Sequence, residues 1–133
     1  MKRFLAFPIF ALAAACAPAG PIEMSPEEQD ELAKAVAGRT AEAPVSCISQ
    51  LNAGGNRSIG EGVILFGDRG DQVIYVNRPA AGCPVTDGGR ALVLRTTTTR
   101  FCRGDIASVV DPVSGSGYGS CALGDFTPYR RND

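Results

Sequence analysis

Two apolar stretches, at positions 62–66 and 72–77, give the clearest secondary-structure signal in the chain. Both are rich in Val and Ile, and the second ends in an aromatic and polar triplet, Tyr75-Val76-Asn77. Between them lies Gly67-Asp68-Arg69-Gly70-Asp71, which consists mostly of residues that form turns. This pattern predicts a β-hairpin.

Shorter β-branched segments, separated by turns that contain Gly or Pro, lie on both sides of this hairpin. Six short strands connected by turns are typical of a small all-β domain. The sequence therefore predicts a mainly β fold, a small antiparallel sheet or barrel over residues 45–133. The four strands expected in addition to the hairpin are at about 45–51, 91–98, 106–110 and 120–127.

A short helix is predicted before the β domain. Ser25 and Glu28 have the spacing of a capping box, in which each residue satisfies a backbone N–H near the other. Leu32 and Val36 form a thin apolar stripe on the same helix. A helix of this length is marginal alone. It either docks on the β domain through this stripe or frays as part of an acidic spacer over residues 16–44.

The N-terminus has the pattern of an export signal. Lys2 and Arg3 precede an apolar run that ends before Cys16. The run is about 12 residues long, which is too short to span a bilayer and suits the apolar core of a signal peptide. We therefore expect residues 1–15 to be removed on export.

The segment Leu12-Ala13-Ala14-Ala15-Cys16 resembles the bacterial lipoprotein box. The resemblance implies that Cys16 is lipidated and becomes the mature N-terminus, anchored to a membrane. Ala17 follows, without the Asp that favours retention in the inner membrane, so the resemblance implies the outer membrane with the domain in the periplasm. The alternative is an ordinary secretory cut at Ala17-Pro18-Ala19, which gives a soluble periplasmic protein.

Four further cysteines lie in the β domain, 36, 19 and 19 residues apart, and the chain has no His. Four cysteines in a small exported domain indicate two disulfides, whereas zinc sites bring their ligands in close pairs. We expect Cys47 to pair with Cys121, because the first and last strands are neighbours in a closed barrel. Cys83 is then expected to pair with Cys102.

The absence of His excludes Ser-His-Asp triads, Cys-His pairs and His-ligated metals. The eight acidic residues of the domain lie mostly beside Gly or Pro, where they are interpreted as turn formers rather than as an acid–base pair. Nine Arg against eight Asp and Glu leave the domain at +1, too balanced for nucleic-acid binding. No enzyme activity, catalytic residue, cofactor or metal is predicted.

Three loop motifs are interpreted structurally. Arg69-Gly70-Asp71 and Arg103-Gly104-Asp105 match an adhesion triplet but are expected to be turns. The Gly- and Ser-rich stretch 114–120 lacks the Lys of a phosphate loop and is expected to be a mobile connection.

The cysteines of the β domain stand in a particular arrangement with their neighbours: Cys47-Ile48, Tyr75-Val76-Asn77, Gly82-Cys83-Pro84, Phe101-Cys102 with Asp105, and Cys121-Ala122-Leu123-Gly124-Asp125-Phe126. This arrangement resembles a family of small exported proteobacterial proteins and lipoproteins of unknown function. The resemblance implies a periplasmic, often lipidated β domain and no catalytic residues. The leading hypothesis is an envelope lipoprotein with a binding or structural role; the alternative is a periplasmic inhibitor of a hydrolase, with Tyr118 as its candidate anchor.

Overall fold

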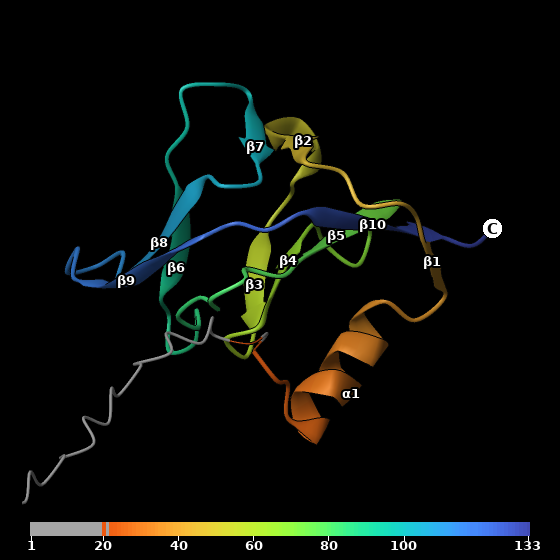
Figure 1. The fold of residues 1–133 in the computed structure, drawn as a ribbon, viewed down its shortest axis with the longest axis horizontal. Helices are drawn as coiled ribbons and strands as arrows, with labels where there is room; N and C mark the ends of the chain where they lie inside the picture. Colours follow the sequence, from red (N-terminus) through yellow and green to blue (C-terminus); the bar gives the residue numbers. More distant parts are fainter. Residues whose placement is uncertain (1–19, 21) are drawn as a thin grey trace, which may run out of the picture.

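A computed structural model describes residue 20 and residues 22–133. In this part of the chain, ten strands form three antiparallel sheets, accompanied by one α-helix and one 3-10 turn (Figure 1). The predicted mainly β class is confirmed. The strands are more numerous than expected, and they form three sheets rather than one sheet or barrel. The predicted signal peptide and Cys16 lie outside the described residues.

The largest sheet has five strands in the order β1-β10-β5-β4-β3. The predicted hairpin is confirmed as β4 and β5, in which Phe66 lies opposite Tyr75. β1 and β3 are not among the predicted strands. The bounds are β1 (Arg39–Ala41), β3 (Asn56–Ile59), β4 (Val63–Phe66), β5 (Val73–Asn77) and β10 (Phe126–Arg131).

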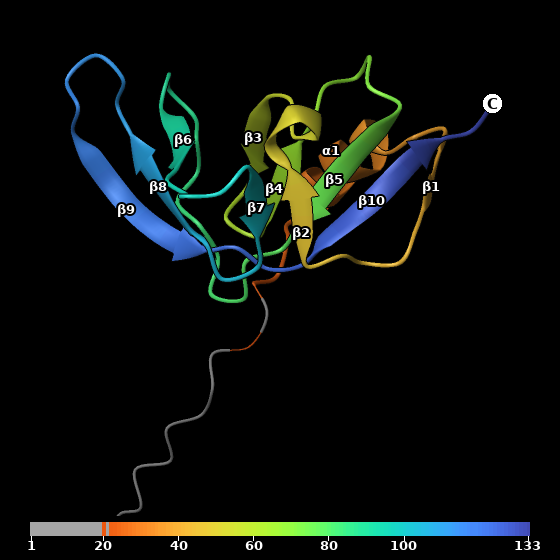
Figure 2. The same ribbon diagram turned by 90° about the horizontal axis from the view of Figure 1, so that it is seen from above.

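Two smaller sheets complete the β structure. One pairs β2 with β7, and the other has the order β6-β8-β9. Figure 2 shows the β6-β8-β9 sheet on one side, the strands β5, β10 and β1 on the other, and β2 and β7 between them. The bounds are β2 (Cys47–Ser49), β6 (Ala91–Leu94), β7 (Arg100–Cys102), β8 (Ile106–Val110) and β9 (Gly117–Ala122), and the 3-10 turn (Gln50–Asn52) follows β2.

Three of the predicted strands differ from expectation. The strand predicted at 45–51 is limited to Cys47–Ser49. The strand predicted at 91–98 ends at Leu94, and the chain then turns. There the Thr96 hydroxyl accepts from Thr98 N at 3.2 Å, and the Thr98 hydroxyl accepts from Arg100 N at 3.3 Å. Such local bonds compete with a strand ladder. The strand predicted at 120–127 is two strands, β9 and β10, separated by residues 123–125.

β4 connects two hydrophobic cores, because all four of its residues are buried. Ile64 and Phe66 face the larger core, which lies between the five-stranded sheet and the two smaller sheets. Val63 and Leu65 face the smaller core on the opposite side. A strand that is covered on both faces has no polar face, which explains its uninterrupted apolar sequence.

The N-terminal helix α1 (Pro26–Ala35) covers the smaller core (Figure 1). Its capping box is confirmed, since Glu28 N donates to Ser25 Oγ at 3.2 Å and Ser25 N donates to Glu28 Oε2 at 2.7 Å. Leu32 and Val36 pack against this core, so the helix docks rather than frays. β1 then pairs with β10. Residues 22–44 are therefore part of the folded unit, and the expected spacer does not extend to residue 44.

The four cysteines form two disulfides, but the predicted pairing is wrong. Cys47 is bonded to Cys102, and Cys83 to Cys121. The prediction assumed a closed barrel with neighbouring first and last strands. Instead β2 pairs with β7, which places Cys47 directly opposite Cys102. Cys121 lies on β9, which pairs with β8 and not with β2.

Candidate binding surface

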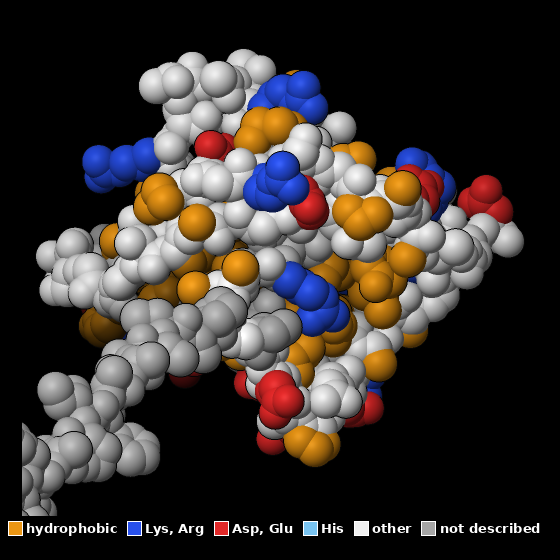
Figure 3. Space-filling model, in the orientation of Figure 1, with side chains coloured by type: hydrophobic (Ala, Val, Ile, Leu, Met, Phe, Trp, Pro, Cys, Tyr) orange, Lys and Arg blue, Asp and Glu red, His pale blue; other side chains and the backbone are white. Residues whose placement is uncertain are grey.

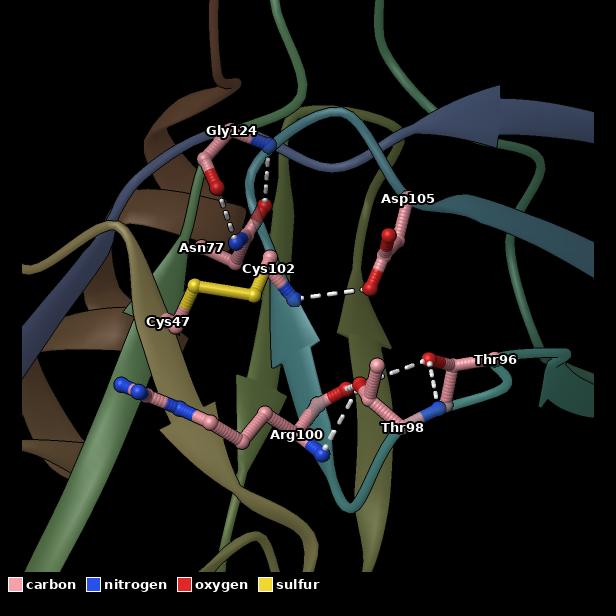
Figure 4. Close-up of a disulfide and its surroundings, with 8 residues drawn as sticks. All are labelled: Cys47, Asn77, Thr96, Thr98, Arg100, Cys102, Asp105 and Gly124. Carbon is pink, nitrogen blue, oxygen red and sulfur yellow. Dashed lines mark hydrogen bonds between the residues drawn. A yellow bond between two sulfur atoms is a disulfide. The ribbon is translucent and has the colours of Figure 1, made fainter.

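The acidic side chains of both Arg-Gly-Asp triplets are turned into their own loops. Asp71 Oδ2 accepts a hydrogen bond from Asp68 N at 2.7 Å. Asp105 Oδ2 accepts one from Cys102 N at 2.8 Å, beside the Cys47–Cys102 disulfide (Figure 4). Asx side chains that bond nearby backbone N–H groups stabilise turns. The triplets are therefore turn formers, as the sequence predicted, and not presented ligands.

Among the described residues there is neither a cluster of side chains placed to hold a metal ion nor a helix suited to crossing a membrane. Within residues 22–133, no group of three or more Cys, Asp or Glu side chains is placed to hold a metal ion. In the same part of the chain, no helix is both long and apolar enough to cross a membrane. On the face shown in Figure 3, basic, acidic and hydrophobic side chains are interspersed.

The β8–β9 hairpin is strongly exposed along its second strand, where only Cys121 is buried. The expected mobile connection over 114–120 is corrected, because β9 begins at Gly117 and its residues pair with β8. Gly and Ser are poor strand formers, so this segment is a strand because of its partner and not because of its composition. Figure 2 shows the hairpin standing at the edge of the molecule, away from β10 and β1.

The loop between β8 and β9 is held by its own hydrogen bonds. Asp111 Oδ1 accepts from Val113 N at 2.8 Å and from Ser114 N at 3.2 Å. In the backbone, Asp111 N donates to Ser116 O and Asp111 O accepts from Gly115 N, both at 2.8 Å. The backbone N–H of Val113, and after it that of Ser114, lowers the pKa of the Asp111 carboxyl, because both hydrogen bonds favour its charged form.

This ordered loop presents an apolar side chain to solvent. Val113 is 95% exposed at the tip of the hairpin. Tyr118 follows on β9, where the Arg90 guanidinium lies 3.9 Å from the centre of its ring. A cation over an aromatic ring is attracted to it, so Tyr118 is held in place while 44% of it stays exposed.

β9 is also an edge strand. The sheet order β6-β8-β9 leaves its outer edge without a partner among the described strands. Gly117–Ala122 contains no charge and no Pro, and all of its residues except Cys121 are exposed. Natural proteins commonly protect such edges with charges, Pro or covering segments. An unprotected edge of six residues can accept an extended segment of another chain by main-chain hydrogen bonding.

The sheet face next to this edge is open and mostly uncharged. A shallow hollow of about 660 Å³ lies over β6, β8 and the start of β9. Val93 and Ser108 line it, with Arg95 and Asp111 as its charged residues. Ile106, on the same sheet, is 55% exposed. The hairpin and this face together form what we call the β9 surface: the loop 111–116, the strand Gly117–Ala122 and the neighbouring Val93.

Comparison with known proteins adds no assignment. No protein-family model matches the chain, and neither a curated protein nor a solved structure matches it. The resemblance to small exported proteobacterial proteins thus stays a prediction. The sequence named Tyr118 as a candidate anchor, and the structure places it on the β9 surface. The sequence analysis did not single out Val113. It interpreted Asp111 only as one of the turn-forming acidic residues, and its hydrogen bonds to Val113 N and Ser114 N agree with that role.

Proposed function

We propose that this chain is a non-enzymatic lipoprotein of the bacterial envelope, whose β domain binds a protein partner through the β9 surface. The observation that carries the proposal is the uncharged, unpaired edge of β9 next to an ordered loop with an exposed Val113. Main-chain bonding along the edge would supply affinity, and the side chains around it would supply specificity.

Two features support a location in the envelope. The domain has two disulfides, Cys47–Cys102 and Cys83–Cys121, which form and persist in oxidising compartments such as the periplasm. Cys16 follows the apolar run of an export signal. Lipidation of Cys16 would anchor the domain to the outer membrane, with the β9 surface available to periplasmic proteins.

Inhibition of a periplasmic hydrolase is the second candidate function. It is favoured by the loop 111–116, which is ordered by bonds to Asp111 before any partner arrives. Pre-organisation lowers the entropy cost of binding, and inhibitors of enzymes commonly insert a pre-formed loop. In this version Val113 at the tip enters the cleft of the enzyme, and Tyr118 contacts its rim.

The test is affinity capture from envelope extracts with matched variants. Val113→Asp puts a charge at the tip of the loop, and Leu51→Asp makes the same kind of change at a residue that is also 95% exposed but lies on the 3-10 turn. We expect a stoichiometric partner to be retained by Leu51→Asp and lost by Val113→Asp. Equal retention by both variants would show that the β9 surface is not the binding site.

The same experiment separates the two candidate functions. If the captured protein is a hydrolase, its activity should fall in proportion to added wild-type protein and should be unaffected by Val113→Asp. A captured partner with no hydrolase activity, or one whose activity is unchanged in the complex, supports the binding role alone.

A further inference from the structure

Four basic side chains that are far apart in the sequence gather at the opposite end of the molecule from β9. They come from α1, β1, the β4–β5 loop and the end of β10. A surface hollow of about 480 Å³ lies among them. Among the described residues that line it, none is acidic. The lining consists of Lys34, Arg39, Arg69 and Arg131 together with the small residues Ala35 and Ala37.

Arg39 is the lining residue with the most hydrogen bonds to the backbone around the hollow. Its Nη1 donates to the carbonyl oxygens of Gln72 at 3.2 Å and Tyr129 at 3.3 Å. Its Nη2 donates to those of Arg69 at 3.1 Å and Asp71 at 2.8 Å. All four terminal N–H groups are thereby used. Arg39 therefore ties the β4–β5 loop, which carries Arg69, to β10, which carries Arg131.

Arg131 shares two of these acceptors. Its Nη2 donates to the carbonyl oxygens of Arg69 at 2.6 Å and Asp71 at 3.3 Å. The guanidinium groups of Arg39 and Arg131 donate to the same two carbonyl oxygens, so two like charges lie close together. Within the described part of the chain, neither Arg39 nor Arg131 makes a salt bridge to a carboxylate. Neutral carbonyls orient these cations but do not cancel their charge.

Further donors around the hollow are free to bind a ligand. In the described residues, the Arg69 guanidinium and Arg131 Nη1 make no hydrogen bond. The Asp71 carboxylate is engaged by Asp68 N inside the loop. Lys34 pairs with Asp30 at 2.6 Å, but this pair is exposed on one helix face and such pairs are weak.

We propose that this hollow binds a phosphate-type oxyanion, with Arg69 and Arg131 as the residues that contact its oxygens. Guanidinium groups match phosphate with two parallel hydrogen bonds. A bound dianion would also relieve the repulsion between the neighbouring guanidiniums. The anion can be free phosphate or the phosphate of a lipid head group. This site is separate from the β9 surface, so its test is independent of the proposed partner binding.

The first experiment titrates the ¹⁵N-labelled full-length mature protein with inorganic phosphate at low salt and follows the Arg Nε–Hε signals by NMR. We expect saturable shifts for Arg69 and Arg131. Arg69→Gln should weaken binding at least about tenfold, the loss of a hydrogen bond to a charged group. Arg69 uses only its backbone in the fold, so this variant should remain folded. Arg100→Gln, an exposed Arg on β7 that does not line the hollow, should bind as wild type.

The second experiment identifies the source of the anion. The Cys16→Ser protein, which lacks the proposed anchor, is sedimented with phosphatidylglycerol or phosphatidylcholine vesicles. Binding to phosphatidylglycerol alone, lost in Arg69→Gln and kept in Arg100→Gln, assigns the site to lipid head groups. Response to inorganic phosphate without vesicle binding assigns it to free phosphate. The proposal is overturned if neither probe binds, or if Arg69→Gln and Arg100→Gln reduce binding equally.

Discussion

Asn77 and Gly124 form a reciprocal pair of hydrogen bonds between a side chain and a backbone. Asn77 Nδ2 donates to Gly124 O at 2.8 Å, and Gly124 N donates to Asn77 Oδ1 at 2.9 Å (Figure 4). The Asn77 side chain thus imitates the pairing of a neighbouring strand. Gly124 lies where the chain leaves the β6-β8-β9 sheet and enters β10 of the five-stranded sheet. The pair therefore fastens the connection between β9 and β10 to β5 of the five-stranded sheet.

The first prediction is that Asn77→Leu strongly destabilises the domain. Asn77 is fully buried and Gly124 is half-buried, so the change leaves the N–H and C=O of Gly124 without the partner that they have in the wild type. Each buried unsatisfied group costs about 1–3 kcal/mol. We expect the free energy of unfolding, measured by urea denaturation, to fall by about 2–4 kcal/mol. Asn52→Leu makes the same substitution at an exposed residue and should have little effect; an equally small effect at Asn77 would contradict the prediction.

Gly124→Ala should be at least as damaging. A Cβ at this position would overlap the backbone carbonyl oxygen of Arg78, which cannot move aside as a flexible side chain can. The added methyl would push the segment around Gly124 away from the end of β5, where Asn77 holds the two together. The measurement is again urea denaturation, and a variant as stable as wild type would show that the crossing is not tightly packed.

The second prediction concerns the disulfides. Non-reducing peptide maps should contain the Cys47–Cys102 and Cys83–Cys121 peptides. These bonds join residues 55 and 38 positions apart, so loop-closure entropy alone gives each about 4 kcal/mol. Cys83 and Cys121 are also buried in the larger core, whereas Cys47 and Cys102 are half-buried.

Replacing both members of a disulfide by Ala should therefore cost more for Cys83 and Cys121, although their loop is shorter. The change removes two sulfur atoms from a packed core and leaves a cavity, which adds to the lost loop constraint. The two double variants are compared by urea denaturation under identical conditions. A larger loss for the Cys47 and Cys102 pair would show that loop length outweighs burial here.

The features that the sequence predicted correctly are local ones. The β4–β5 hairpin follows from two apolar runs around a turn, and the capping box follows from Ser25 and Glu28. β3 could not be predicted in the same way, because Asn56, Arg57 and Ser58 are polar, and its strand depends on pairing with β4. The conformation of such segments is decided by tertiary partners rather than by propensity.

The disulfide pairing and both candidate sites depend on contacts between distant residues. The predicted disulfide pairing assumed that Cys121 lies on the last strand, beside the first. In the structure the chain breaks around Gly124, so Cys121 belongs to β9 and the last strand is β10. The basic hollow joins residues from 34 to 131, so no local motif marks it. On the β9 surface only Tyr118 could be named in advance, because the unpaired edge becomes apparent only when the sheet order is known.

The third prediction tests the anchor. Intact-mass analysis of protein from membranes should show a triacylated Cys16. Each buried acyl methylene contributes about 0.8 kcal/mol to membrane binding, so these chains are expected to hold the protein at the membrane. Cys16→Ser should release the protein to the periplasm. It should leave the unfolding free energy unchanged, because Met24 is the most N-terminal of the described side chains that pack on the smaller core. A soluble wild-type product that begins at Gly20 would instead indicate an ordinary signal peptide.

The fourth prediction is that the β8–β9 loop loses its order in acid through Asp111. Hydrogen bonds from Val113 N and Ser114 N lower the pKa of this carboxyl below its ordinary value of 3.8. Because the folded-state pKa is the lower one, the stabilisation is complete above the ordinary value and is lost as the pH falls through the folded-state pKa. The loop is therefore expected to be intact near neutral pH and to loosen only in strong acid.

The measurement is the pH dependence of the Val113 and Ser114 amide proton shifts. Both should move together, with a midpoint below 3.8. Asp111→Asn is the matched control, because its amide oxygen still accepts hydrogen bonds but does not titrate. In that variant both signals should stay constant over the same range. A midpoint above the ordinary value, or an unchanged titration in Asp111→Asn, would show that Asp111 does not hold the loop. Asp111→Ala should then weaken partner capture only if an ordered loop is what the partner recognises.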